Sequence, residues 1–484
     1  MKREFIINII LLILINLIIK PVYIFGIEAR IQNLVGTESY GLYFDYFNFV
    51  FLFQFINDPG IQSWNAQFVP KVKQDIGFHF PKILTLKLWL SVIYIGIVWT
   101  IASVMGYERS DLIILLSINM ILSTMFMYFR GTIAGLGYYR TDSLLSAADK
   151  LTMIIILGYL AWIAPYKHTF RIEALIYGQM IAYTSACLIA LSVVWYKIPE
   201  KKWGLSVGYI KEKFVAFLPY TLVIFLVAGY SRLDGVMLGR MLDDNNYQAG
   251  LYATAFRFYD AANMVGYLFA ALLLPMYASS LKDKIQLDEL IRTGLRFIVV
   301  CAVIIVCTLC FYSMELMQLL YDEATIQFAR VLVILSISFF SVAIAYIFGT
   351  LLVAGDKVRK LNYLYAAGLV LNFTLNFWLI PDYQALGAAW TTLFTQLLIM
   401  TGQIYYAVHS FKLVVGRSLI FSLMLYAGLI TGVFWFISDS FSFGWIYHIS
   451  LSVLISLLLA FILKIINPVE ALNLLKSGKS GAVV

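Results

Sequence analysis

The feature that most constrains this chain is a recurring apolar block. Blocks of about 18–25 mostly apolar residues, separated by short polar stretches, follow one another along the whole sequence. A helix needs about 20 apolar residues to cross the hydrocarbon core of a bilayer, and it satisfies its own backbone hydrogen bonds there. The alternation typical of a membrane β-barrel is not visible. The pattern therefore predicts an all-α polytopic membrane protein.

Fourteen such blocks are expected to be transmembrane helices. Of the 484 residues 62% are hydrophobic and 13% are charged, which excludes an ordinary water-soluble enzyme. No stretch between blocks is long enough to fold as a domain outside the membrane. The expected helices cover residues 5–26, 42–63, 82–105, 111–129, 144–165, 173–196, 214–238, 250–275, 291–313, 328–353, 361–381, 385–408, 418–438 and 443–465.

Lysine and arginine fall mainly in alternate connections between the blocks. Cytoplasmic loops carry an excess of positive charge, so this bias predicts a multi-pass protein of the inner (cytoplasmic) membrane with both termini in the cytoplasm. The other connections are rich in acids, and their basic residues are Arg30, Arg109, Lys167, Arg171 and Arg240. The bias also accounts for the net charge of +8 without nucleic-acid binding.

Two short repeats indicate an internal duplication. Gly41-Leu42-Tyr43 recurs about 209 residues later as Gly250-Leu251-Tyr252, and the segment that follows Gly131 is echoed after Gly349. Two six-helix copies would have the same orientation in the membrane, with the binding site between them. We expect an N-terminal lobe over residues 1–205, a C-terminal lobe over 206–410, and two extra helices with a cytoplasmic tail over 411–484.

Several of these segments resemble the multidrug/oligosaccharidyl-lipid/polysaccharide exporter superfamily. The resemblance rests on Leu34 to Tyr43, Asp58-Pro59-Gly60, residues 250–255 and residues 371–376, covers helices 1–12, and is nearest to the O-antigen-type flippases of the polysaccharide-biosynthesis branch. It implies a carrier that moves a polyprenyl-diphosphate-linked oligosaccharide across the membrane by alternating access. The cavity of such flippases is cationic, and their helix 8 arginine corresponds to Arg257.

Basic side chains inside the blocks, and Arg30 in the connection after the first block, are candidate substrate-binding groups, because a charge near the bilayer centre costs about 2.5–3.5 kcal/mol. A guanidinium group suits a phosphate, to which it donates two parallel hydrogen bonds. Snorkelling to the outer headgroups is the alternative for Lys20. A structural ion-pair cluster of Arg232, Asp234, Arg257 and Asp260 is another alternative. The candidate cavity cations are Arg257, Arg232, Lys20 and Arg30.

Uncharged polar groups and three carboxylates are candidates for lining a cavity or for ion coupling. Asp45, close to Asn48 on helix 2, could pair with Lys20 or Arg30, bind a proton or cation, or be a solvated acid at the interface. Asn372 and Asn376 share one face of helix 11, where they bond between helices or line a cavity. Asp234 and Asp260 complete this group of candidates.

Two other features of helices 2 and 8 are informative. Both helices are rich in aromatic residues, including Tyr43 and Tyr252, for which an aromatic belt at the membrane interface is favoured over sugar stacking. Helix 2 contains Pro59 and Gly60, which should break the helix and provide a hinge, because proline lacks the amide donor.

We expect that nucleotide hydrolysis does not drive transport, because no phosphate-binding loop motif is present in the sequence. Energy would come from a proton or sodium gradient or from the membrane potential. The four histidines are scattered, so neither a metal site nor a cofactor is predicted. The expected partners are the lipid-linked glycan and membrane lipids, and a monomer suffices. The alternatives are a cation-coupled multidrug antiporter or a lipid II flippase, whereas a membrane-embedded glycosyltransferase is disfavoured by the short external loops.

Overall fold

The computed structural model describes residues 18–163, 170–198, 200–201, 203–204, 207–414, 416–441 and 444–466. All regular secondary structure in these ranges is helical. The chain forms two compact units, residues 1–250 and residues 251–484. The lobe boundaries expected from the sequence, after residues 205 and 410, stay predictions.

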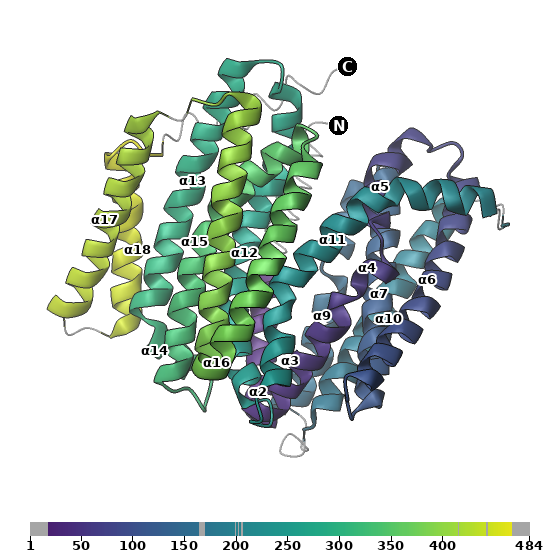
Figure 1. Ribbon diagram of the computed structural model, residues 1–484, viewed down its shortest axis with the longest axis horizontal. Helices are drawn as coiled ribbons and strands as arrows, with labels where there is room; N and C mark the ends of the chain where they lie inside the picture. The colour runs from purple at the N-terminus through teal and green to yellow at the C-terminus, as the bar shows by residue number, and fades with distance from the viewer. Residues whose placement is uncertain are drawn as a thin grey trace. The chain divides into compact units, whose positions relative to one another are not determined.

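The first unit is a helical bundle, drawn from purple to teal in Figure 1. In it α7 packs against α10, α6 and α5, while α3 packs against α11. Phe80, Tyr128, Phe129 and Phe217 are buried in one cluster of its core. Its elements are η1 (Val22–Glu28), α2 (Ala29–Val35), α3 (Thr37–Leu52), α4 (Gln54–Asn57), α5 (Ile61–Phe68), η2 (Val69–Lys71), α6 (Ile76–Val104), α7 (Ser110–Gly135), α8 (Tyr139–Leu145), α9 (Ala148–Gly158), η3 (Tyr159–Ile163), α10 (Ile172–Lys197), α11 (Val207–Met241) and the first turn of α12 (Tyr247–Ser280).

The second unit continues from α12 and ends in a helix pair, drawn in yellow-green and yellow in Figure 1. In it α15 packs against α13 and α16, α13 packs against α17, and α17 packs against α18. Its further elements are α13 (Lys284–Phe311), α14 (Ser313–Leu320), α15 (Ile326–Ala354), α16 (Val358–Phe411), α17 (Arg417–Ser440) and α18 (Trp445–Ile462).

The helices confirm the expected multi-pass architecture. Eleven helices in the described ranges are long and apolar enough to cross a membrane. One of them, α16, covers two expected blocks, because Gln384 has a non-helical backbone (φ 54°, ψ −133°) that divides it. The first two blocks correspond to the helical residues 18–35 and to α3–α5, although residues 1–17 of the expected first helix lie outside the described residues.

The first helix ends later than expected. It runs past residue 26 to Val35 and stops at Gly36, whose φ of 83° does not continue a helix. Glu28 and Gln32 lie on its buried side, with 4% and 3% of their surfaces exposed. Inside the unit both of these polar residues have partners. Gln32 donates from Nε2 to the carbonyl oxygen of Gly250.

Candidate functional site

The expected break in the second helix is present. α4 ends at Asn57, Gly60 has a left-handed backbone (φ 93°, ψ 14°), and α5 begins at Ile61. Thr221 of α11 donates to the carbonyl oxygen of Pro59 over 2.7 Å. A Cβ atom on Gly60 would collide with Tyr220, so only glycine fits the turn and the contact with α11. Whether this break acts as a hinge stays a prediction.

A buried ion pair holds the break, and it is absent from the sequence-based candidates. Lys87 of α6 places Nζ 3.1 Å from Oδ2 of Asp58, and the two side chains are 0% and 4% exposed. Beside it, Ser91 donates to Oδ1 of Asn57, and Asn57 donates to the hydroxyl of Thr124. Lys87 lies well inside an expected block, so a count of charges within the blocks would have found it.

Asp45 is neither solvated nor paired with Lys20 or Arg30. It is fully buried and accepts a hydrogen bond of 2.9 Å from the hydroxyl of Tyr107. Nε of Arg240 lies 3.4 Å from its other carboxylate oxygen, and the Arg240 guanidinium stacks 4.0 Å from the Tyr107 ring centroid. The sequence placed Arg240 in an outer loop, whereas α11 extends to Met241 and carries this arginine to Asp45.

Two glycines allow α3 and α11 to approach each other. The side chain of Asn48 lies over Gly235, and that of Asp45 lies over Gly239. A Cβ atom on Gly239 would be 2.5 Å from Cγ of Asp45, which is far closer than van der Waals contact. The spacing of four residues puts both glycines on one face of α11, an arrangement that favours close helix packing in membranes. The sequence analysis overlooked this pair.

The substitution Gly239→Ala is expected to destabilise the protein by about 1–3 kcal/mol, because the added methyl group must push α3 away from α11. Thermal unfolding in detergent measures this loss. The matched control is Gly96→Ala, since the space around Gly96 in α6 is open and alanine is the better helix former. Equal unfolding temperatures for both variants would contradict the close packing.

The arginines expected in the cavity have different surroundings in the two units. In the first unit, the Arg232 guanidinium lies 4.9 Å from the ring centroid of Phe51, and Asp234 is 2% exposed. In the second unit, Arg257 lies 4.0 Å from Asp260, three residues later on α12, as the spacing allows. The Arg257 side chain is 12% exposed. Their assignment to a substrate cavity stays a prediction.

Lys20 lies deeper than the sequence indicated. Because the helix continues to Val35, Lys20 is about 22 Å from that end of the helix by helical rise, and snorkelling to the outer headgroups stays an alternative. The charged groups that act on it are Lys150, Asp149 and Arg130. These two basic groups and one acidic group belong to α7 and α9 of the same unit, and the sequence analysis selected none of them.

Lys150 and Arg30 both lie against aromatic rings. Nζ of Lys150 is 4.6 Å from the ring centroid of Tyr23 and 3.8 Å from a carboxylate oxygen of Asp149. The Arg30 guanidinium is 5.0 Å from the ring of Trp162. Nε of Arg30 is buried and has no hydrogen-bond partner. Lys150 lies within an expected apolar block, so its charge was the signal by which the sequence analysis could have selected it.

The two asparagines of helix 11 bond to each other. Nδ2 of Asn376 donates to Oδ1 of Asn372 over 3.2 Å, and both residues are fully buried in α16. In the second half of α16, the buried hydroxyls of Thr391 and Thr395 have no hydrogen-bond partner. The asparagine amides therefore belong to a buried polar part of the second unit.

The expected interfacial aromatic belt is wrong for the aromatics of α3 and α12. Tyr43 is 2% exposed and exchanges hydrogen bonds with Gln179, while Tyr252 is 1% exposed and shares one with Thr392. Each tyrosine thus lies inside its own unit rather than at a lipid interface. The spacing of the apolar residues and the composition could not distinguish a position inside the unit from one at the lipid interface. Both positions favour a ring that ends in a hydroxyl group.

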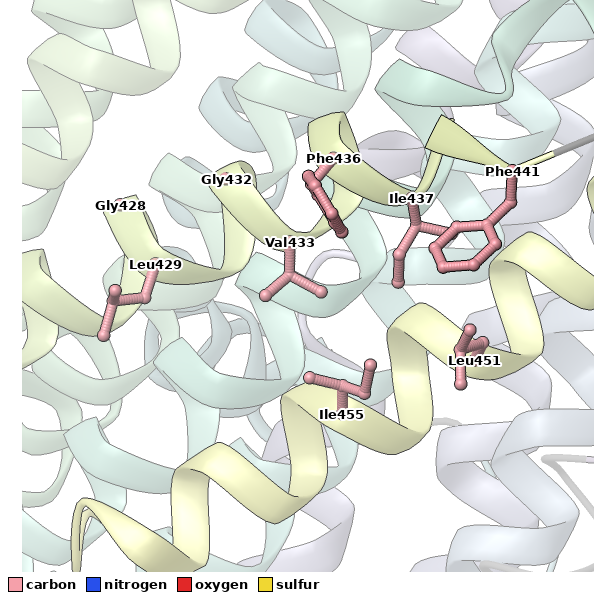
Figure 2. A pocket seen from close by; sticks show the side chains of 9 residues that line it. All are labelled: Gly428, Leu429, Gly432, Val433, Phe436, Ile437, Phe441, Leu451 and Ile455. Atoms are coloured by element: carbon pink, nitrogen blue, oxygen red, sulfur yellow. The ribbon is translucent and has the colours of Figure 1, made fainter. Parts of the chain in front are cut away.

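An apolar groove runs between α17 and α18 of the second unit (Figure 2). Its volume is about 470 Å³. Gly428 and Gly432 have open space above them, and these small residues leave room between the two helices. The groove is lined by Gly428, Leu429, Gly432, Val433, Phe436, Ile437, Phe441, Leu451 and Ile455.

Comparisons with known proteins agree with this architecture. The family described as "Polysaccharide biosynthesis protein" matches residues 5–281, more than half of the chain. No curated protein matches the sequence.

Among solved structures, the lipid II flippase MurJ in an inward closed conformation is similar at 14% identity and a TM-score of 0.69, covering 94% of this chain and 98% of that one. The inward-facing conformation of a multidrug resistance MATE family transporter is similar at 12% identity and a TM-score of 0.64, covering 83% of this chain and 98% of that one. At such identities these likenesses show the fold. Together with the family match, they show that the chain belongs to the polysaccharide-biosynthesis branch of the multidrug/oligosaccharidyl-lipid/polysaccharide exporter superfamily, a superfamily of flippases and transporters.

Proposed function

We propose that the chain is a flippase that translocates a polyprenyl-diphosphate-linked oligosaccharide across the cytoplasmic membrane by alternating access, for the synthesis of a cell-surface polysaccharide. Such a substrate has three parts: an anionic diphosphate, a long apolar tail and a polar glycan. The family match supports the general process, and the side chains inside the helices support the anionic substrate.

The observation that carries the proposal is the pairing of carboxylates within the apolar blocks. A carrier of cationic drugs needs carboxylates that can receive a cation. Here two of them, both buried, already lie within 3.4 Å of a basic side chain, so they are poorly suited to that task. The pairs are Asp45 with Arg240 and Asp58 with Lys87.

Arginines supply the complementary chemistry for a diphosphate. Arg257 and Arg232 lie within α12 and α11, and each can offer a planar fork of donors to phosphate oxygens. Lys20 adds an ammonium group in the first unit, where its basic neighbours Lys150 and Arg130 lie 3.8 Å and 2.8 Å from carboxylate oxygens of Asp149 and Asp142. A charge-assisted hydrogen bond contributes about 1.5–3 kcal/mol, so one bidentate contact can dominate the recognition of a headgroup.

The groove between α17 and α18 is suited to the apolar tail of the substrate. All of its lining side chains are hydrocarbon, and about 0.8 kcal/mol is gained for each methylene group removed from water. A groove with open space above its glycines accepts a narrow, flexible hydrocarbon chain more readily than a bulky drug molecule. Two helices beyond the duplicated twelve would then serve the lipid part of the substrate.

Filling this groove is expected to impair transport of substrates with a long tail. The substitution Gly432→Trp places an indole where the space is open, and losing contact with about two methylene groups should lower transport about tenfold. A short-tail analogue should be transported normally. The matched control is Leu454→Trp on the exposed side of α18. An equal loss for both tail lengths would argue against this role of the groove.

The proposed function is tested with purified protein in liposomes that contain a labelled lipid-linked oligosaccharide. The proposal predicts that the label changes leaflet while the mass of the lipid stays the same. A change in mass would indicate a glycosyltransferase instead. Uptake of cationic drugs without movement of the lipid would indicate a multidrug antiporter, and selective movement of lipid II would indicate a lipid II flippase.

The energy source is part of the same proposal. Imposing a proton gradient, a sodium gradient or a membrane potential on these liposomes, one at a time, identifies the coupling that drives net movement. The protein is proposed to work as a monomer, so the rate per molecule should not depend on the number of molecules in each liposome.

A further inference from the structure

One side of α3 contacts α11 and the first turn of α12 mainly through small and polar residues, all within the first unit. The residues on this side are three or four positions apart, so they form a row along one face of the helix. We call this row the contact stripe, and it consists of Thr37, Gly41, Asp45 and Asn48. Opposite it lie Gly235, Gly239, Asn246 and Gly250. All four residues of the contact stripe are buried, although none of them is a large apolar residue.

The glycines that open the two repeated Gly-Leu-Tyr segments take part in this contact reciprocally. A Cβ atom on Gly41 would collide with the carbonyl oxygen of Asn246, and a Cβ atom on Gly250 would collide with the carbonyl oxygen of Thr37. Thr37 and Asn246 each stand four residues before the glycine of their own repeat. Equivalent positions meet in this way when two copies are related by a twofold axis. The contact stripe is therefore a place where the two copies of the duplicated segment meet.

Asp45 is the charged member of the contact stripe, and it ties α3 to α11. Its Oδ2 lies 3.4 Å from Nε of Arg240, and its Oδ1 accepts a hydrogen bond of 2.9 Å from the hydroxyl of Tyr107. The Asp45 side chain is fully buried, whereas the Arg240 side chain is 27% exposed. Water therefore reaches one partner of this ion pair, while the other partner is enclosed.

The contact leaves part of its hydrogen-bonding capacity unused. Among the described residues, Oδ1 of Asn48, Oδ2 of Asp45 and Oδ1 of Asn246 are buried and have no hydrogen-bond partner. In addition, Asn245 and Asn246 both have left-handed backbones, with φ of 54° and 65°. Buried acceptors without donors and consecutive left-handed residues both cost free energy, and strained backbone of this kind gathers at functional sites. Separation of the helices would let water reach the acceptors, which offsets part of the lost contact.

We propose that the contact stripe is the outer seal of the transport pathway and that the pair of Asp45 with Arg240 is its latch. When substrate is released outward, α3 separates here from α11 and the first turn of α12. The inference rests on alternating access, which is part of the proposed function. The charge bias assigns the connections at this end, which contain Glu38 and Asp243, to the outer side.

A permanent helix contact explains the contact stripe less well than a seal that opens. Glycines favour close packing in permanent helix pairs too, so they do not decide between the two. A permanent contact in a protein interior normally gives its buried polar atoms hydrogen-bond partners. The acceptors of Asn48 and Asp45 without donors, and the access of water to Arg240, fit a contact that forms and breaks in each transport cycle.

The test is a distance measurement by pulsed electron paramagnetic resonance between spin labels on Glu38→Cys and Asp243→Cys, in liposomes without substrate. Both native side chains are exposed, one beside the contact stripe and the other in the turn before α12. The four native cysteines are replaced by alanine, so that the labels attach only at these two positions. The proposal predicts a main population at a short distance and a minor population at a longer distance.

The variant Asp45→Asn should raise the ratio of the longer to the shorter distance about tenfold, because one charge-assisted contact of the closed state is lost. The matched control is Asp111→Asn, which removes the same charge from an exposed ion pair with Arg109. This control should leave the ratio unchanged. The same distance distribution for Asp45→Asn and for the protein with native Asp45 would overturn the latch.

A second measurement keeps every residue of the contact stripe native. A reducible crosslinker between the same two cysteines should stop transport of the lipid-linked oligosaccharide in liposomes, and reduction should restore it. Full transport by the crosslinked protein would overturn the seal. A protein that shows the tenfold shift in distances but moves no lipid-linked oligosaccharide before crosslinking would support the latch and contradict the proposed substrate, so the two failures are distinguishable.

Discussion

Replacing Lys87 by methionine is expected to lower the free energy of unfolding by about 3–5 kcal/mol, because the substitution leaves the Asp58 carboxylate buried without its cation. The ion pair is 3.1 Å long, and neither side chain is more than 4% exposed. Asp58→Asn should cost a similar amount, since it leaves the ammonium group unpaired. Detergent-solubilised protein unfolded by heat or denaturant gives both values.

The double variant Asp58→Asn with Lys87→Met distinguishes a pair from two independent groups. It removes both charges, so it should recover most of the stability that either single variant loses. The comparison for an exposed pair is Arg109→Met, which breaks the contacts of Arg109 with Asp111 and Glu173 and should cost only about 0–1 kcal/mol. Additive losses in the double variant would contradict the pairing of Asp58 with Lys87.

Replacing Arg257 by alanine is expected to lower transport of the lipid-linked oligosaccharide about 100-fold, while the protein still inserts and purifies. Two charge-assisted hydrogen bonds to a phosphate would contribute about 3 kcal/mol, which corresponds to this factor. Arg257→Lys should keep part of the activity, because lysine retains the charge but not the planar fork. The liposome assay with labelled substrate measures the transport rates of the wild-type protein and of the two Arg257 variants.

The matched control for Arg257 is Arg330→Ala, which removes an exposed arginine near the start of α15. This variant should transport at the wild-type rate. Full activity of Arg257→Ala would show that the contact of Arg257 with Asp260 serves only to join turns of α12, and the assignment of Arg257 to the substrate would then fall.

Much of the fold could be predicted from the sequence because the bilayer imposes a length on each helix. The apolar blocks predicted the helices, and the segment Asp58-Pro59-Gly60 predicted the break between α4 and α5. Helix ends were harder to predict, because a buried polar residue such as Gln32 looks like an exposed one in a sequence. The late end of the first helix in turn places Lys20 about 22 Å from that end.

The partners of charged residues could not be predicted, because they lie on different helices. Asp58 and Lys87 are 29 residues apart, and Asp45 meets Arg240 only because Gly235 and Gly239 admit α3 to the surface of α11. Pairing within one helix is different, since a spacing of three residues already brings two side chains together. That spacing permitted a pair of Arg257 with Asp260, and their side chains lie 4.0 Å apart.

The most direct test of the central claim is mass spectrometry of polyprenyl-linked lipids from cells depleted of this protein. A flippase for a lipid-linked oligosaccharide predicts that the completed lipid-linked oligosaccharide accumulates, and its mass would identify the glycan. Unchanged lipid-linked sugars, together with increased sensitivity of the cells to cationic drugs, would contradict the claim and favour a multidrug antiporter.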